Sequence, residues 1–229
     1  SEWAKLFASA PNYRAYGNAI LSGPSEKFRW IFGPMWYRGR LGKNEVKIFI
    51  VGQEGAQDEN LSNRAFTGST GTKTQKFLNH LGINRSYLFL NTFVYTINGQ
   101  LDAEDPRFSW MEQNSQSPIV QYRHKLFDNM AATNKDSLTV LLGVGTGGKA
   151  SLATWVNKYG NGDKPACSTQ KNMEKCDTSG VEKAFGLKHK LLVIGVPHPG
   201  GASPNNGGEA AYQNIIRGFS SAAARVASH

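Results

Sequence analysis

The stretch VKIFIVGQEGAQDE at residues 46–59 joins a mostly apolar run to a glycine-rich acidic loop. An apolar run of this length is typical of a strand that is covered on both faces. Gly52 and Gly55 then permit a tight turn. A buried strand that ends in such a turn is typical of α/β proteins, whose ligands bind just beyond the carboxyl ends of the strands.

Three further apolar runs resemble the first, at residues 87–90, 138–142 and 191–196. Helices are predicted between and after the strands, at residues 72–81, 119–132, 149–158 and 208–227. Strands that alternate with helices indicate a parallel sheet with helices on both sides. We therefore predict a three-layer α/β/α sandwich around a central, mostly parallel four-stranded sheet.

A chain of 229 residues fits one such unit, so we predict a single domain over residues 1–229. Residues 1–45 are predicted to form a helical cap over the sheet, with contact of their aromatic and basic side chains to nucleic acid as the alternative. Residues 159–180 are largely polar and predict a surface insertion loop. No run of 18 apolar residues occurs and the first residues lack the layout of a signal peptide, so we expect neither a membrane span nor a secretory leader.

The charge balance points to a polyanionic partner. The chain has 26 basic and 17 acidic residues, a net charge of +9 and an isoelectric point of about 9.6. Such a balance favours nucleic acid as the partner, and a basic surface that serves solubility is the alternative. The two cysteines, Cys167 and Cys176, are too few for a four-ligand metal cluster. We expect free thiols in a reducing cytoplasm, with one local disulfide as the alternative.

Acidic, aromatic and amide side chains follow the first two strands. Glu54, Asp58 and Glu59 lie in one loop, where a carboxylate either acts in catalysis or caps a helix. Phe66 lies in a polar, glycine-rich segment and either stacks on a flipped base or anchors its own loop. Asn91 ends the second strand, where its amide either reads an imide edge or ties down the loop.

The last two strands are also followed by distinctive turns. His198 lies between two prolines and before two glycines, and this stiff setting favours a functional histidine. Residues 143–150 (GVGTGGKA) satisfy one dinucleotide-binding pattern and nearly satisfy the P-loop, but Ala150 replaces the hydroxyl that would hold Mg²⁺. The alternative is a strand-to-helix turn whose N–H groups, from Gly145 to Lys149, hold a DNA phosphate.

Four motifs in the same order together resemble the uracil-DNA glycosylase superfamily. Residues 50–54 (IVGQE) resemble the Gly-Gln-Asp-Pro-Tyr-His motif of its best-known branch, and residues 88–96 (LFLNTFVYT) resemble that branch's Leu-Leu-Leu-Asn-Thr strand. Residues 63–68 (NRAFTG) are similar to the Arg-x-Phe-x-Gly pattern of the iron–sulfur branch. His198 and Pro199 are similar to the His-Pro-Ser motif.

The resemblance implies a role for each matched residue. Glu54 falls at the place of the catalytic Asp, with Asp58 as the alternative acid, and His198 would stabilise the departing base at O2. Gln53, Phe66 and Asn91 would bind the base. The loop that contains Gly200, Gly201 and Ser203 would approach the minor groove of DNA.

The departures from the family motifs indicate a divergent branch without the iron–sulfur cysteines. Gly55, Ala56 and Gln57 replace the Pro, Tyr and His of the first motif, so Ala56 cannot exclude thymine as the tyrosine does.

We therefore expect hydrolysis of the N-glycosidic bond of deoxyuridine in DNA by base flipping, with free uracil as product. The expected enzyme is a monomer without metal or organic cofactor, in the cytoplasm with the nucleoid. A non-catalytic relative that captures a flipped base and a P-loop-like nucleotide-binding protein are the two alternatives.

Overall fold

The computed structural model describes residues 1–20, 34–52, 79, 85–95, 114–168, 173–197 and 208–229. Its centre is a sheet of five strands in the order β1-β3-β2-β4-β5. The strands are β1 (Arg38–Gly39), β2 (Ile48–Gly52), β3 (Tyr87–Asn91), β4 (Val140–Val144) and β5 (Leu192–Val196). The helices are α1 (Glu2–Ala8), α2 (Tyr13–Ile20), α6 (Pro118–Thr133), α7 (Gly145–Lys158), α8 (Ser179–Phe185), α9 (Gly208–Ser228) and the short 3₁₀ helix η2 (Met173–Lys175).

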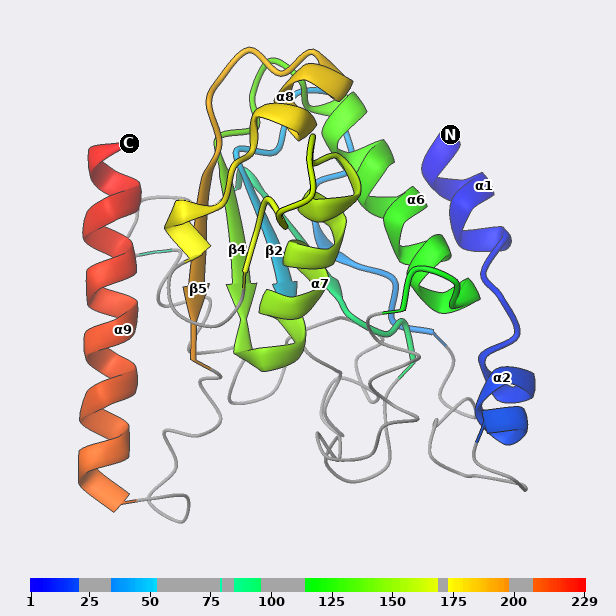
Figure 1. Ribbon diagram of the computed structural model, residues 1–229, viewed down its shortest axis with the longest axis horizontal. Helices are drawn as coiled ribbons and strands as arrows, with labels where there is room; N and C mark the ends of the chain where they lie inside the picture. The colour runs from blue at the N-terminus through cyan, green and yellow to red at the C-terminus, as the bar shows by residue number, and fades with distance from the viewer. Residues whose placement is uncertain (21–33, 53–78, 80–84, 96–113, 169–172, 198–207) are drawn as a thin grey trace.

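The predicted α/β sandwich is confirmed, because helices cover both faces of the sheet. Alternate strand residues point to opposite faces. Phe49, Val51 and Leu141 pack with α6 and α7, whereas Ile50 and Leu142 pack with Ala222 and Ala223 of α9. Figure 1 shows α9 beside β5 and α6 and α7 on the other side of the sheet. Both faces are apolar, which explains why the strands are continuous apolar runs.

The predicted count of four strands is wrong by one. The four predicted strands form a parallel sheet, and β1 adds a short antiparallel strand beside β3. Two residues are too few to give an apolar run, so the sequence pattern does not reveal β1. Gly39 is needed there because its φ is +111° and an added Cβ would lie 2.1 Å from the Tyr87 carbonyl oxygen.

Helix α7 begins four residues earlier than the predicted start at residue 149, at Gly145. We read the glycines of residues 143–148 as a loop because glycine is a poor helix former. In the structure they let the helix approach the sheet closely. A Cβ on Gly148 would lie 2.2 Å from the carbonyl oxygen of Val51 in β2.

The other predicted helices agree with their ranges where the structure describes them, and α8 is a helix that was not predicted. Helices α6 and α9 cover the predicted residues 119–132 and 208–227. Residue 79 is helical, and the rest of the predicted helix at 72–81 lies outside the described residues. In the predicted cap, α1 packs on α6, because the Tyr122 hydroxyl of α6 donates a hydrogen bond of 3.0 Å to the Leu6 carbonyl.

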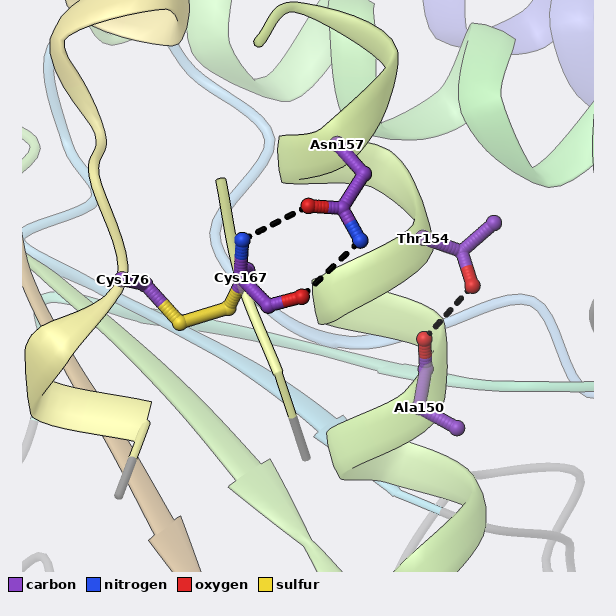
Figure 2. Close-up of a disulfide and its surroundings, with 5 residues drawn as sticks. All are labelled: Ala150, Thr154, Asn157, Cys167 and Cys176. Atoms are coloured by element: carbon purple, nitrogen blue, oxygen red, sulfur yellow. Dashed lines mark hydrogen bonds between the residues drawn. A yellow bond between two sulfur atoms is a disulfide. The ribbon is translucent and has the colours of Figure 1, made fainter. Parts of the chain in front are cut away.

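The expectation of free thiols is wrong, because Cys167 and Cys176 form a disulfide. Figure 2 shows Asn157 of α7 beside the bridge, where its side chain bonds both the backbone N–H and the carbonyl of Cys167. Within the predicted insertion loop at 159–180, Cys167 and Met173 are buried. No described helix is both long enough and apolar enough to cross a membrane.

Candidate active site

The carboxyl ends of the four parallel strands lie along one edge of the sheet. Gly52 of β2 pairs with Asn91 of β3, and Val144 of β4 pairs with Val196 of β5. Figure 1 shows the arrowheads of β2, β4 and β5 directed to the same edge. The chain crosses from β3 on one side of β2 to β4 on its other side, and α/β proteins bind ligands at such a crossing point. We call this edge the carboxyl edge.

Asn91 is a buried amide with no hydrogen-bond partner at this edge. Its side chain is 4% exposed, and neither Oδ1 nor Nδ2 has a partner among the described residues. A buried polar group without a partner costs about 1–3 kcal/mol of folding stability. Because most buried polar groups are satisfied, such a group in a ligand edge indicates a partner that arrives from outside. The amide offers one acceptor and one donor group to that partner.

The residue after Asn91 is fully engaged in holding the edge together. The Thr92 hydroxyl donates a bond of 2.8 Å to the Gly52 carbonyl, and the Thr92 N–H bonds the same oxygen at 2.9 Å. The Ser151 hydroxyl lies 2.8 Å from the Thr92 hydroxyl and 2.8 Å from the Gly147 carbonyl oxygen, and its one proton is donated to one of these two at a time. This buried chain of bonds fixes the ends of β2 and β3 to the first turns of α7.

Our sequence analysis missed the role of Thr92 and Ser151. Thr92 lies in residues 88–96, the segment that resembles a strand motif of the family, so its position is a usable signal. Ser151 had none, because its contact with Thr92 spans 59 residues of sequence.

The amino-terminal end of α7 lies at the same edge and has no side-chain cap. Strand β4 runs directly into the helix at Gly145, whose φ is +73°. No loop of the P-loop kind therefore separates the strand from the helix, which weakens the nucleotide-binding alternative. Val144 at the N-cap position makes no side-chain capping bond. The positive end of the helix dipole at such a terminus favours an anion.

Lys149 extends from α7 across the sheet. An added Cβ on Gly143 would lie 2.8 Å from the Lys149 Cα, and one on Gly195 would lie 2.6 Å from its Cδ. The stem of the lysine therefore runs from β4 towards β5. Its side chain is half-buried and makes no ion pair among the described residues.

Buried aromatic residues connect the amino-terminal segment to the end of β3. Tyr13 of α2 packs against Tyr95 with ring centres 5.2 Å apart. Burial, assisted by the neighbouring Tyr122, raises the pKa of the Tyr13 phenol above its usual range, so this contact is neutral at physiological pH. No three His, Cys, Asp or Glu side chains in the described part of the chain lie close enough to hold a metal ion.

Three of the predicted site residues lie in the described part of the chain, Asn91 at the end of β3 and Gly145 and Lys149 in the first turns of α7. The other predicted residues lie outside the described part of the chain, and their roles stay predictions: Gln53, Glu54, Asp58, Phe66, His198, Gly200, Gly201 and Ser203. Gln53 directly follows the end of β2, and His198 comes two residues after the end of β5.

Residues 40–219 match the family model of the Uracil DNA glycosylase superfamily. The match includes the whole parallel sheet, α6, α7 and most of α9. No curated protein matches the chain.

Proposed function

Because the chain belongs to the uracil-DNA glycosylase superfamily and is therefore a DNA glycosylase, we propose that it removes uracil from DNA as a monomer. The observation that carries the choice of uracil is the unpaired amide of Asn91. Uracil presents an N–H donor beside carbonyl acceptors on its pairing edge. One amide supplies an acceptor for the N–H and a donor for the neighbouring carbonyl, as Asn91 does.

The buried setting of Asn91 makes this reading selective. A site built to hydrogen-bond a polar edge rejects a base with the wrong donor and acceptor order, because buried groups are then left unpaired. The Thr92–Gly52 bonds hold the strand end in place, so the backbone that carries the Asn91 amide is fixed before the base arrives. Cytosine carries an amino group where uracil has O4, and in the amide orientation that reads uracil it would set two donors against each other.

DNA must present the base outside its stack for this recognition. Flipping costs a few kcal/mol, and less in a mismatch or a single strand. The amino-terminal end of α7, with its positive dipole end, and the cationic Lys149 lie at the same edge as Asn91 and are suited to hold a backbone phosphate. Contacts of this kind offset the cost of flipping.

The reaction separates a cationic sugar from an anionic uracil, and water then attacks C1′. By resemblance to the family, His198 would stabilise the anion, and Glu54 or Asp58 would stabilise the cation and orient the water. One oriented donor to a developing anion is typically worth about 3–4 kcal/mol of barrier. Water supplies a proton to the uracil anion and a hydroxide to C1′ of the sugar, which gives free uracil and an abasic sugar.

The test compares Asn91→Ala with the wild-type protein on an oligonucleotide that contains a single uracil, either single-stranded or opposite G or A. We expect the single-turnover rate of uracil release to fall about 100-fold or more, since a buried recognition pair is lost. We expect the free energy of unfolding to stay equal or rise, because the variant no longer buries an unpaired amide.

Asn161→Ala is the matched control, because Asn161 is exposed and lies away from the carboxyl edge. If Asn91→Ala unfolds more easily and keeps its activity, Asn91 is a structural residue and the proposal is wrong. Tight binding of uracil DNA by the wild-type protein without release of free base would instead select the non-catalytic relative.

A further inference from the structure

A hollow of about 280 Å³ lies at the opposite end of the sheet from the candidate active site. Its lining residues surround the amino ends of β2 and β3: Arg40, Asn44, Glu45, Lys47, Arg85 and Ser86. Strand β2 rises about 3.3 Å per residue, so Lys47 and the carboxyl edge are roughly 15 Å apart. The hollow is therefore a separate place on the molecule.

The walls of the hollow are fixed by the sheet. The Arg40 N–H bonds the Tyr87 carbonyl at 2.9 Å, and the Lys47 N–H bonds the Ser86 carbonyl at 2.8 Å. The Arg40 Nε donates to the Arg85 carbonyl at 3.2 Å, which connects the two arginines through the backbone. Asn44 is held by bonds to Asp136 at 2.8 and 3.1 Å. The three cationic side chains therefore start from rigid backbone positions.

The cations of the hollow have no anionic partner in the part of the chain that the structure describes. Within the described residues, neither Arg40 nor Lys47 nor Arg85 forms an ion pair. The one carboxylate, Glu45, folds against Gly42, where an added Cβ would lie 2.4 Å from its Oε2. Three cations and one carboxylate leave the hollow with an excess of positive charge.

We propose that this hollow binds a phosphate group. Arginine presents a planar fork of N–H donors that matches phosphate oxygens, and lysine adds a compact positive charge. The Ser86 hydroxyl and the Asn44 amide add neutral polar groups to the same hollow. A tetrahedral phosphate offers several acceptor oxygens, enough for two arginines and one lysine at once.

The phosphate group comes from one of two sources, a nucleic-acid backbone or a free phosphate such as a mononucleotide. A backbone phosphate is favoured by the net charge of +9 and by exposed lysines along the same end of the sheet, at Lys135, Lys188 and Lys190. While DNA is engaged at the carboxyl edge, the hollow about 15 Å away would then bind a flanking or a second segment of nucleic acid.

The test follows the backbone amide signals of the whole protein by NMR at low salt while sodium phosphate is added against a sodium chloride blank. We expect saturable shifts at residues 40–47 and 85–86. In the double variant Lys47→Gln/Arg85→Gln the apparent Kd for phosphate should rise by about tenfold or more, since two charged donors are removed. Lys125→Gln/Lys164→Gln loses the same charge at exposed positions elsewhere and should bind as the wild type does.

The proposal would be overturned if the amide signals of many lysines across the surface shifted equally. It would also be overturned if Lys47→Gln/Arg85→Gln bound phosphate as the wild type does. Arg85→Lys serves as the variant least able to disturb folding, and partial retention of phosphate binding supports the site. A uracil-free oligonucleotide that moves the same amide signals at lower concentration than phosphate identifies a backbone source. A mononucleotide that does so while the oligonucleotide does not identifies a free phosphate. Asn91→Ala should leave these phosphate-induced shifts unchanged, whether or not it abolishes uracil excision. Failure of one proposal can therefore be told apart from failure of the other.

Discussion

Single residues at the carboxyl edge divide into those that hold the structure and those left open to a ligand. The hydroxyl and the N–H of Thr92 both bond the Gly52 carbonyl, whereas the adjacent Asn91 side chain is buried without a partner among the described residues. Adjacent residues in a strand point to opposite faces, so the two side chains meet different surroundings. The end of β3 is therefore fixed, and it carries the Asn91 amide at a set position.

Gly148→Ala tests how closely the helix must approach this edge. The added Cβ would lie 2.2 Å from the Val51 carbonyl oxygen, and that contact is with backbone. Helix α7 would have to shift away from β2, which we expect to lower the free energy of unfolding by about 1–3 kcal/mol and to slow uracil release. Urea unfolding and the excision assay measure the two effects.

Gly218→Ala in α9 is the control for the change of residue type. There the nearest atom to an added Cβ is Pro197 Cδ at 3.2 Å, a side-chain atom that can move slightly. We expect a change within about 1 kcal/mol, since the helix propensity of alanine offsets the tight contact. Equal stability for both variants would contradict the role that we give to Gly148.

The sequence was sufficient to find Asn91, because it ends an apolar strand at a ligand edge. It could not show that the amide lacks a partner, since that depends on every neighbour in space. It also could not pair Thr92 with Ser151, which are remote in sequence.

Among the secondary-structure elements, the strands were predicted most closely. Strands β2, β3, β4 and β5 begin and end within two residues of the predicted runs, because burial on both faces leaves an apolar signature. The start of α7 was wrong because glycine has two uses that a single sequence does not separate. It breaks helices in general, and it permits a helix to touch a strand at Gly148.

Helix α6 contains a buried histidine that should make stability depend on pH. Burial lowers the pKa of His124 to about 4, with the positive charges of Arg123 and Lys158 acting in the same direction and Asp128 opposing them. Its Nε2 has no partner in the described structure. The unfolded chain binds this proton below about pH 6.5, whereas the folded chain does so only near pH 4.

Stability should therefore fall as the pH is lowered from about 6.5 to about 4, with a contribution from His124 of up to roughly 3 kcal/mol. Thermal unfolding at closely spaced pH values measures this loss. His124→Gln should flatten the curve in that interval, whereas His189→Gln, at an exposed site, should leave it unchanged. A wild-type curve with no slope between pH 4 and 6.5 would contradict the assignment.

For the molecule as a whole, the segment around η2 connects the two helical layers. Met173 lies against β5, since an added Cβ on Gly195 would be 2.8 Å from its Sδ and 2.6 Å from the Lys149 Cδ. Glu174 forms an ion pair with Arg225 of α9. On the other side, Asn157 of α7 holds Cys167 (Figure 2). The disulfide closes this connection, and two cysteines in a polar sequence left it as the alternative to free thiols.

Cys167→Ser/Cys176→Ser should therefore affect both stability and DNA binding. Loss of a bridge that spans nine residues should lower the free energy of unfolding by roughly 2–3 kcal/mol, from the chain entropy of the closed loop. A looser Met173 no longer supports the stem of Lys149, so the KM for uracil DNA should rise while kcat changes less. Thermal unfolding and steady-state kinetics with and without a phosphine reductant measure these effects.

The reductant itself provides the control. Reduced wild-type protein should match the double serine variant in melting temperature and KM, and the variant should not respond to reductant at all. Lys149→Gln should raise KM by itself, and adding it to the double serine variant should raise KM by less than it does in the oxidised wild type. Independent, fully additive effects would show that the disulfide stabilises the fold without positioning Lys149. If the reductant did not change the melting temperature of the wild-type protein, the disulfide would not stabilise the connection between the two helical layers.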